Sequence, residues 1–506
     1  MNPHRARGPV DEFDESTSRH PSQFPPASDG KNPFVLIVGA GIGGLFLAIL
    51  LERAGIPYQV FERAPEVKAL GSVLGINANI LPVFEQLGFY EEFQKIALPL
   101  ASIDLRYGNN NPIAKVDIDY HDLIGYNYMM FARPRLYDFF LSKIPAERIH
   151  FGKKVMSILQ NRDGAMIRCS DGTTYHGDIL VGADGAYSAV RQSLFKQLQE
   201  KSLLPQVDTK ELNKGYTCLV GTTNSLSPEK YPIVAKSIGE QFQYVVQGTP
   251  YTWSLFNVPE NRLCYVVVQQ YASKEEAEEE TFRNSEWGPE KSGSMIEKVK
   301  DFLLPFGSGT LGDLIDETPR DKISRVFLEN KLFETWTHGR TVLIGDAVHK
   351  LLPSGAQGAV CAMQDAVILA NCLYDLKSLK HESIEEALQD YKQQRYSQVK
   401  VQDSDSNVNA TLFFGQTMIE KCIRHIVFNW LPKSLMSKTV IKDASYRPQV
   451  AFLPLAPIRG SGPVLPQKPS WRYEKEQKLK REEEDDQKRA RASEQDASIG
   501  SLPTPL

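Results

Sequence analysis

The longest apolar stretch of the chain lies near its beginning, at residues 34–51, FVLIVGAGIGGLFLAILL. It contains 18 residues and no charge, and a second apolar run, YQVF at 58–61, ends at an acid. Apolar residues, then small residues, then more apolar residues predict a buried strand, a tight turn, a helix and a second strand. The length also suits a membrane span, but the four glycines inside the run and the acid-terminated strand beyond it favour the strand–turn–helix interpretation.

The glycines of this turn follow the pattern G-x-G-x-x-G, and each has a physical reason. Gly39 permits the sharp turn, Gly41 lets the backbone approach a diphosphate, and Gly44 lets the helix pack closely on the strand. The unpaired N–H groups at the start of the helix would face the diphosphate. Glu62 follows Gly39 by 23 residues, where an acid can accept hydrogen bonds from ribose hydroxyls. The segment therefore predicts a dinucleotide-binding loop.

Two further stretches, 135–191 and 340–376, return to strand and helix patterns, and residues 216–270 between them read as several strands. Sheet-forming sequence thus interrupts nucleotide-fold sequence. We expect an α/β (α+β) fold with a Rossmann-like cofactor domain, an inserted β-sheet substrate domain and a C-terminal helical region. The expected ranges are 33–105, 135–200 and 325–400 for the cofactor domain, 106–134 and 201–324 for the substrate domain, 401–450 for the helical region, and 451–506 for a Pro-rich coil and charged tail.

Residues 407–442 show helical periodicity, with apolar positions gathered on one face. That face carries Ile419, Cys422, Ile423, Ile426, Val427 and Trp430, and the nearby positive charges are Lys421, Arg424, Lys433 and Lys438. An amphipathic cationic helix can lie on a membrane surface, so peripheral membrane contact is one expectation. A helix that packs this face on the domain core has the same pattern, and it is the commoner case.

Composition narrows the class of protein. The chain has 506 residues, 42% hydrophobic and 24% charged, with a formal net charge of −4 that gives no electrostatic reason to expect nucleic-acid binding. Its six cysteines are scattered, without C-x-x-C or metal-ligand spacing, so we expect no metal site and a reducing, intracellular compartment. Residues 1–32 are polar and lack the apolar core of a secretory signal, so we expect them to be disordered. The cytoplasm or the cytosolic face of a membrane is the expected location.

A second small-residue turn lies at 178–191, DILVGADGAYSAVR, between a strand and a helix. Its glycines remove side chains where the backbone would approach a ligand, and Asp184 between them is a candidate cofactor-binding residue. Arg191 on the helix either reaches the cofactor or pairs with an acid. An ordinary β-turn would look the same, so this segment gains its meaning beside the others.

The third turn lies at 340–370, RTVLIGDAVHKLLPSGAQGAVCAMQDAVILA. A buried strand ends at Asp346, whose carboxylate could accept a hydrogen bond from a ribityl hydroxyl. A small-residue turn then opens a long helix, whose positive end would stabilise the negative charge that a reduced isoalloxazine develops, and Ala359 leaves room for the ring. His349 is a candidate base, but a turn histidine that bonds the backbone is the favoured interpretation.

These three motifs, in this order, resemble the class A flavoprotein monooxygenases with the para-hydroxybenzoate hydroxylase fold. Closer likeness appears in ERAPEV at 62–67, LGSVLGINAN at 70–79, GAQGAV at 355–360 and QDAVILANCLYDL at 364–376, which are similar to fungal FAD-dependent epoxidases of indole-diterpene and meroterpenoid pathways. The resemblance implies bound FAD. It places contacts to FAD at Glu62, Gly75, Arg133, Asp346 and Ala359, with Arg135 as the alternative to Arg133.

The resemblance also implies a reaction. The chain contains no second strand–helix unit built on G-x-G-x-x-G, so NADPH is expected to bind transiently, reduce FAD and leave. O2 would then supply one oxygen atom to a π bond of an apolar small molecule, giving an epoxide from a prenyl double bond. By the same likeness, Tyr251 is the catalytic candidate that orients the substrate, with Tyr216 and Tyr244 as rivals, and a packed sheet aromatic as the alternative role.

Other activities on the same scaffold stay open at this point. Hydroxylation of a phenol or aromatic acid is the main alternative, although residues 216–270 contain one arginine, Arg262, and no basic pair for a carboxylate. An alkene reductase, a halogenase and a noncatalytic FAD-binding protein are further alternatives. A flavin halogenase would be expected to carry W-x-W-x-I-P, which the chain lacks.

Overall fold

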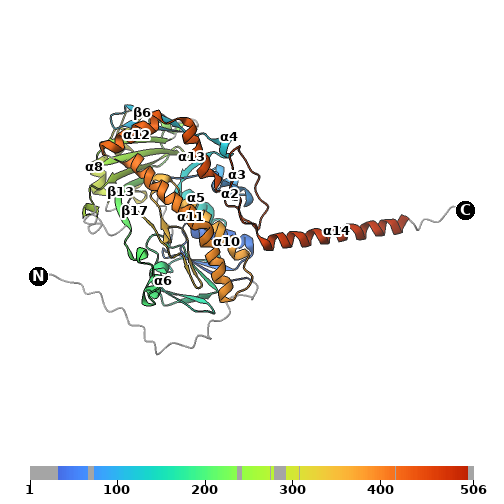
Figure 1. Cartoon of the computed structure of the whole chain (residues 1–506). Helices are drawn as coiled ribbons and strands as arrows, with labels where there is room; N and C mark the ends of the chain where they lie inside the picture. Colours follow the sequence, from blue (N-terminus) through green and yellow to red (C-terminus); the bar gives the residue numbers. More distant parts are fainter. Residues whose placement is uncertain are drawn as a thin grey trace.

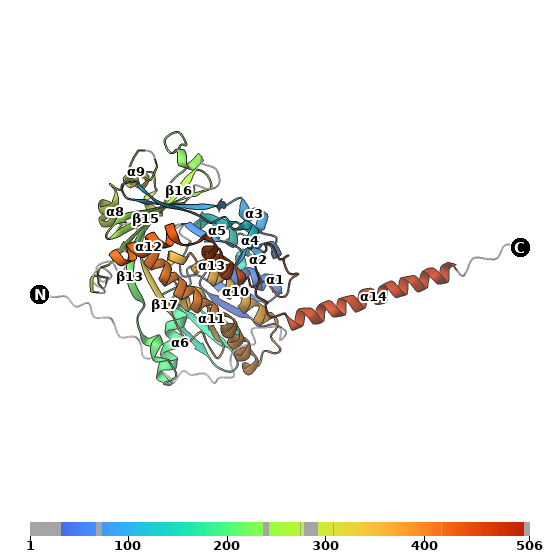
Figure 2. The ribbon, with the colours of Figure 1, turned by 45° about the horizontal axis from the view of Figure 1, so that its top comes forward.

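The computed structural model describes residues 32–66, 73–235, 242–273, 275–277, 292–306, 308–415 and 417–499 (Figure 1). The expectation of disorder at residues 1–32 therefore falls outside the described residues, except for the last one. The body of the molecule is built on two large sheets, and a long C-terminal helix leads away from it (Figures 1 and 2).

The first large sheet has six strands in the order β18-β19-β12-β1-β2-β8, and all neighbours are parallel except β18 and β19. Its central strand β1 is fully buried, as expected for a parallel sheet covered on both faces. The strands are β1 (Val35–Val38), β2 (Tyr58–Phe61), β8 (Ile149–His150), β12 (Ile179–Gly182), β18 (Thr337–His338) and β19 (Thr341–Leu343).

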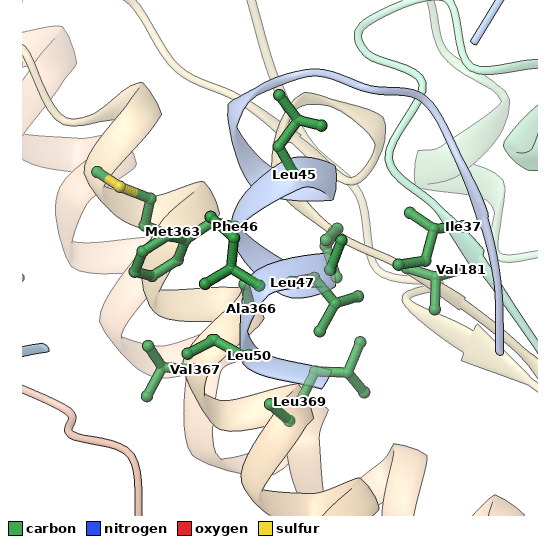
Figure 3. Close-up of a cluster of buried hydrophobic side chains, with 14 of the residues drawn as sticks. Ile37, Leu45, Phe46, Leu47, Leu50, Val181, Met363, Ala366, Val367 and Leu369 are labelled. Carbon is green, nitrogen blue, oxygen red and sulfur yellow. The ribbon is translucent and has the colours of Figure 1, made fainter. Parts of the chain in front are cut away.

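Helix α1 (Ile42–Ala54) follows β1 directly and packs against α10 (Gly358–Tyr374) (Figure 3). Both helices are apolar on nearly every side because they lie between the sheet and other helices. Phe46 and Met363 meet at their interface, and each such buried side chain contributes about 1.5–3 kcal/mol to stability (Figure 3). α1 ends where Gly55 adopts a left-handed conformation, φ 66°, and donates its N–H back to the helix.

The second large sheet has eight strands in the order β20-β17-β13-β16-β15-β14-β5-β6, antiparallel except for the β14–β5 pair. The strands are β5 (Ser102–Tyr107), β6 (Pro112–Asp117), β13 (Asn213–Thr222), β14 (Phe242–Gly248), β15 (Tyr251–Val258), β16 (Arg262–Gln270), β17 (Ser324–Leu332) and β20 (His349–Lys350).

Alternation along these strands creates two apolar faces. The outer face, which includes Leu219, Trp253 and Tyr265, packs under α8 (Gly293–Val299) and α9 (Leu311–Asp316). The inner face packs against α11 (His381–Phe414) and a small sheet that joins β3 (Val73–Ile76), β7 (Tyr128–Ala132) and β4 (Leu98–Leu100). Residues of the inner face are Tyr216, Cys218, Val220, Tyr244, Val246, Phe256, Val258, Val266, Val268 and Leu328.

Smaller elements complete the body. A three-stranded sheet in the order β11-β10-β9 and several helices pack around the parallel sheet. Their bounds are β9 (Val155–Gln160), β10 (Ala165–Cys169), β11 (Thr174–Gly177), α2 (Leu81–Gln86), α3 (Tyr90–Gln94), α4 (His121–Ile124), α5 (Arg133–Leu141) and α6 (Ala189–Glu200).

The C-terminal region is largely helical. After α11 come α12 (Met418–Trp430) and α13 (Lys433–Ser445), and then an irregular segment leads to α14 (Trp471–Ile499). α14 falls within the range expected to be coil and tail. Its charges alternate in sign at helical spacing, as in the Lys478–Glu482 pair, which supports an exposed helix. Within the described residues, no helix is both long and apolar enough to cross a bilayer.

The eight-stranded sheet extends a few residues beyond the ranges expected for the substrate domain. β5 begins at Ser102, and β17, which pairs with β13, continues to Leu332. A strand pattern shows that a strand exists but does not show which of two sheets it joins, and this is why the sequence placed these residues with the cofactor domain.

Candidate functional site

The loop between β1 and α1 has the close contacts that its glycines predicted. Gly39 has φ 107°, and a Cβ there would lie 2.3 Å from the carbonyl oxygen of Ala183. A Cβ at Gly44 would lie 2.1 Å from the carbonyl oxygen of Gly39. At Gly41, by contrast, the nearest atom would be 3.9 Å away. Gly39 and Gly44 are therefore needed for packing, whereas the protein itself leaves room for a Cβ at Gly41.

The beginning of α1 suits an anion. Its N-cap, Gly41, provides no side chain to bond the first N–H groups, and the first turn contains no acid. Glu62 lies just after β2, and its two carboxylate oxygens accept hydrogen bonds from the N–H groups of Ala40 and Ala64, each at 2.9 Å. The acid is therefore held beside the glycine loop, although contact with a ribose stays a prediction.

Asp184 and Arg191 stabilise the second turn from within. Asp184 accepts hydrogen bonds from the Ser188 hydroxyl at 2.5 Å and from the Ala189 N–H at 2.6 Å, so it caps the start of α6. Arg191 donates to the carbonyl of Ala347 at 2.7 Å and lies over the ring of Phe333. Both side chains order the loops around the site, and Arg191 pairs with carbonyl groups rather than with an acid.

The third turn brings Asp346 to the end of β19. Its carboxylate pairs with Lys350, with 2.5 Å between Oδ2 and Nζ. Burial raises the pKa of Asp346, but attraction by Lys350, His349 and Arg133 outweighs it, so the net pKa lies below the ordinary value. The Arg133 side chain is accessible to solvent, but the protein atoms packed around it disfavour its charge and lower its pKa. The nearby carboxylate of Asp346 offsets only part of this effect. A side chain that is both deep and accessible suits the wall of a ligand site.

A second helix without a side-chain cap, α10, begins close to the start of α1. α10 begins after Gln357 without a side-chain cap or an acid in its first turn, and nothing lies within 4 Å of a Cβ built at Gly358. Ala359 is partly buried at this end. Ala356, the residue before the N-cap Gln357, has φ 52°. This is a left-handed conformation that L residues keep only where the surrounding structure requires it. A Cβ at Gly43 of α1 would lie 3.2 Å from the Cβ of Ala362, so α1 and α10 touch near their uncapped ends.

Gly75 contributes a further close approach. A Cβ at this position would lie 2.3 Å from the ring of Tyr128 on the neighbouring strand β7. Burial raises the pKa of Tyr128 to about 12, so its hydroxyl stays protonated at neutral pH. Only glycine therefore lets this ring lie against β3.

Sequence reasoning missed a buried ionic group below the third turn. Asp365 on α10 bonds Nε2 of His349 at 2.5 Å, Nε of Arg395 at 2.8 Å and the N–H of Gly345 at 2.9 Å. The side chains of all three ionisable residues are completely buried. One signal was present, because Asp365 is the only charged residue in the helix 358–374. The position of His349 excludes its use as a solvent-accessible base.

The three candidate tyrosines separate onto the two faces of the eight-stranded sheet. Tyr251 lies on the outer face, where its ring packs 5.5 Å from that of Phe302. Tyr244 lies on the inner face and donates its hydroxyl to the carbonyl of Phe413, and Tyr216 packs there on Phe414. The structure thus does not bring Tyr251 together with the three glycine turns, and this placement favours its rivals.

The inner face forms an apolar wall with few polar groups. Cys218, Val220 and Val268 contact Leu352 and the end of α11, and Phe256 and Val258 contact β7. Arg262, the one arginine of residues 216–270, pairs with Glu260 at 2.8 Å at the β15–β16 turn. The described residues contain no group of three His, Cys, Asp or Glu side chains that could hold a metal ion.

Comparisons with known proteins agree with this geometry. The family described as "FAD binding domain" matches residues 33–214 and 234–402. The chain is 31% identical over 385 residues to the FAD-dependent monooxygenase ptmM of Penicillium ochrochloron, covering 72% of this chain and 85% of that protein. It is 27% identical over 437 residues to the aurachin C monooxygenase/isomerase of Stigmatella aurantiaca, covering 83% and 98%.

Solved structures show the same fold. The chain is similar to Klebsiella pneumoniae HpxO complexed with FAD and uric acid, with a TM-score of 0.65 and 21% identity over 82% of this chain and 97% of HpxO. The α/β architecture with an FAD-binding domain expected from the sequence is confirmed.

Proposed function

Because this chain belongs to the FAD-binding-domain family of flavin-dependent monooxygenases, we propose that it uses NADPH and O2 to epoxidise an alkene of an apolar, prenylated natural product. That it is an FAD-dependent monooxygenase follows from the family itself. The reductant, the substrate class and the choice of epoxidation are the proposal.

The residues of the site fit FAD. The room at Gly41 and the open space at Gly358, beside two uncapped helix starts, suit the diphosphate and the pyrimidine edge of the flavin. We propose that Glu62 holds the adenosine ribose, Asp346 the ribityl chain, and Arg133 the exposed edge of the ring system. Gly39, Gly44, Asp184 and Gly75 keep the loops in place, and Ala359 borders the ring. When bound, FAD supplies the redox chemistry that splits O2.

The apolar inner face is the observation that supports an apolar substrate. Its valines, Cys218 and Phe256 exclude water, and such exclusion keeps the activated oxygen from being lost as hydrogen peroxide. Arg262 is already paired with Glu260, which leaves it poorly placed to bind a substrate carboxylate. These features favour a prenyl group over an aromatic acid, although a neutral phenol would also fit.

A tyrosine of the inner face is the proposed substrate-orienting residue. Tyr244 is almost fully buried, and its hydroxyl needs only to leave the Phe413 carbonyl to donate to a substrate oxygen. Tyr216 is the second candidate on the same face. The earlier expectation for Tyr251 would require its ring to act from the opposite side of the sheet.

A pair of substrates tests the proposal. The purified enzyme is incubated with FAD, NADPH, isotopically labelled O2 and a prenylated indole, and in parallel with the same indole carrying a saturated side chain. We expect the alkene to gain one labelled oxygen atom, as an oxirane by NMR, and the saturated analogue to stay unchanged. Equal oxygenation of both compounds would show ring hydroxylation instead. NADH in place of NADPH tests the reductant.

We also propose an intracellular location. All six cysteines are free, and five of them are buried, which is typical of proteins kept in a reducing compartment.

A further inference from the structure

Helix α12 carries its apolar side chains on the outside of the molecule. Ile419, Ile423, Ile426 and Trp430 follow one another at spacings of four, three and four residues, so they form one stripe along the helix. The stripe is exposed along its whole length, with Ile419 73% and Trp430 75% accessible. Of the two interpretations offered by the sequence, packing of this face on the domain core is therefore wrong.

The opposite side of α12 holds the helix on the protein. Arg424 is buried and donates to the carbonyls of Leu412 and Gly415, where the end of a helix leaves backbone acceptors without helical partners. Phe428 packs on Phe413, with 5.6 Å between ring centroids. A charged residue thus faces inward and the isoleucines face outward, the reverse of an ordinary surface helix.

The segment that contains the outward stripe is rich in basic residues. Residues 417–442 contain five lysines and arginines and a single acid, in a chain whose net charge is negative. That acid, Glu420, is occupied by the capping box with Thr417 at the start of α12. Lys421 and His425, together with Arg424, border a cavity of about 370 Å³ on the side of α12 that faces the body, next to Asn109 and Gln247. The segment 417–442 therefore carries a net positive charge.

We propose that α12 is a membrane-docking helix that lies flat on an anionic lipid surface, with the Ile419–Trp430 stripe inserted among the acyl chains. The net positive charge of the region favours anionic lipid over a second copy of the same face, which would repel its partner. An exposed tryptophan at the end of an isoleucine stripe also suits a membrane interface.

The position of α12 assigns a role to membrane contact, namely access of the substrate, and this role rests on the proposed function. Phe428 contacts Phe413, and Phe413 in turn contacts Tyr244 on the inner face of the large sheet, with 5.2 Å between ring centroids. α12 therefore lies next to the apolar wall proposed for the substrate. A substrate dissolved in the lipid would then reach the enzyme on the side that faces the membrane.

Vesicle binding by the full-length holoenzyme tests the docking. We expect co-sedimentation with vesicles of phosphatidylcholine containing about one third phosphatidylserine, much less with phosphatidylcholine alone, and weakening by salt. The double variant Ile419→Glu/Ile426→Glu should bind at least about tenfold more weakly. Leu203→Glu is the control: Leu203 is 59% accessible, between Ile426 at 52% and Ile419 at 73%, but it follows α6, which lies far from α12 (Figures 1 and 2). This variant should bind as the wild type does. Equal binding of the wild type and the double variant would overturn the proposal.

Cys422 provides a second readout, because it is the one exposed cysteine and lies on the outward side of α12. An environment-sensitive dye on Cys422 should shift its emission to the blue when anionic vesicles are added. A dye that responds instead to rising protein concentration, together with a dimer that the double variant dissociates, would show that a second copy covers the stripe, and would overturn membrane docking.

The result can be separated from the monooxygenase assay. With a detergent-solubilised substrate, the double variant should retain FAD and oxidise NADPH at the wild-type rate. With the same substrate in anionic vesicles, its rate should fall. If no substrate gains oxygen under either condition, the proposed function fails, and vesicle binding is judged on its own.

Discussion

Asp365 and Arg395 form a buried ion pair beneath the Asp346 turn, with 2.8 Å between Oδ1 and Nε and no exposure of either side chain. The second oxygen of Asp365 bonds both His349 and the N–H of Gly345. A single carboxylate therefore joins α10, α11 and the loop that carries Asp346. This connection explains how a flexible Gly-Asp turn can hold a carboxylate at a fixed place.

Replacing Asp365 with Asn should destabilise the fold strongly. The guanidinium of Arg395 would stay buried without its counter-charge, and breaking a buried pair from one side costs about 3–5 kcal/mol. Urea unfolding measures the loss, and flavin absorbance retained after gel filtration should fall with it. Asp390→Asn is the control, because its pair with Lys468 is partly exposed and should cost less than about 1 kcal/mol. Equal effects of the two variants would contradict the role assigned to Asp365.

Features formed by residues close together in the sequence could be predicted, and features formed by residues far apart could not. The β1–α1 loop was predictable, because the glycine spacing of Gly39, Gly41 and Gly44 and the change from strand to helix pattern lie within one short segment. The resemblance to FAD monooxygenases is confirmed for the same reason, since it rests on such segments. The Asp365–Arg395 pair was not predictable, because its members lie 30 residues apart and meet only after two helices pack. A strand pattern likewise shows that β15 has two faces, but not which face meets the cofactor domain.

The two glycines of the first loop should respond differently to a methyl group. Gly41→Ala should fold with a loss of about 1 kcal/mol or less, because its φ is −74° and its surroundings are open, yet it should bind FAD more weakly. Gly39→Ala should cost about 2 kcal/mol or more, because φ is 107° and the new Cβ would meet the backbone of Ala183. Thermal unfolding of the FAD-free proteins separates stability from binding. Normal FAD affinity in Gly41→Ala would contradict placement of the diphosphate at this loop.

Asp443 on α13 should make the protein less stable as the pH rises. Burial, with repulsion from Asp405, raises its pKa to about 6, so the folded state holds a proton that the unfolded chain releases near pH 4. Stability from this group is therefore complete below about pH 4 and declines as the pH passes 6. Asp443→Asn should gain about 1–2 kcal/mol at pH 8 and nothing at pH 4, measured by urea unfolding. Asp405→Asn should gain less, because the burial of Asp443 would remain.

The faces of the large sheet make the tyrosine assignment testable. Tyr244→Phe removes a hydroxyl on the inner face, so the rate of oxygen transfer should fall about tenfold to a hundredfold if that hydroxyl orients the substrate. Tyr251→Phe removes a hydroxyl on the outer face, next to Phe302, and should leave turnover within about twofold of the wild type. Single-turnover oxygenation is the measurement, and the ratio of product to hydrogen peroxide should fall in Tyr244→Phe alone. A merely structural role for Tyr244 would lower stability without changing that ratio. Loss of turnover in Tyr251→Phe with Tyr244→Phe unaffected would restore Tyr251 as the catalytic candidate, and would require the substrate to bind on the opposite side of the sheet.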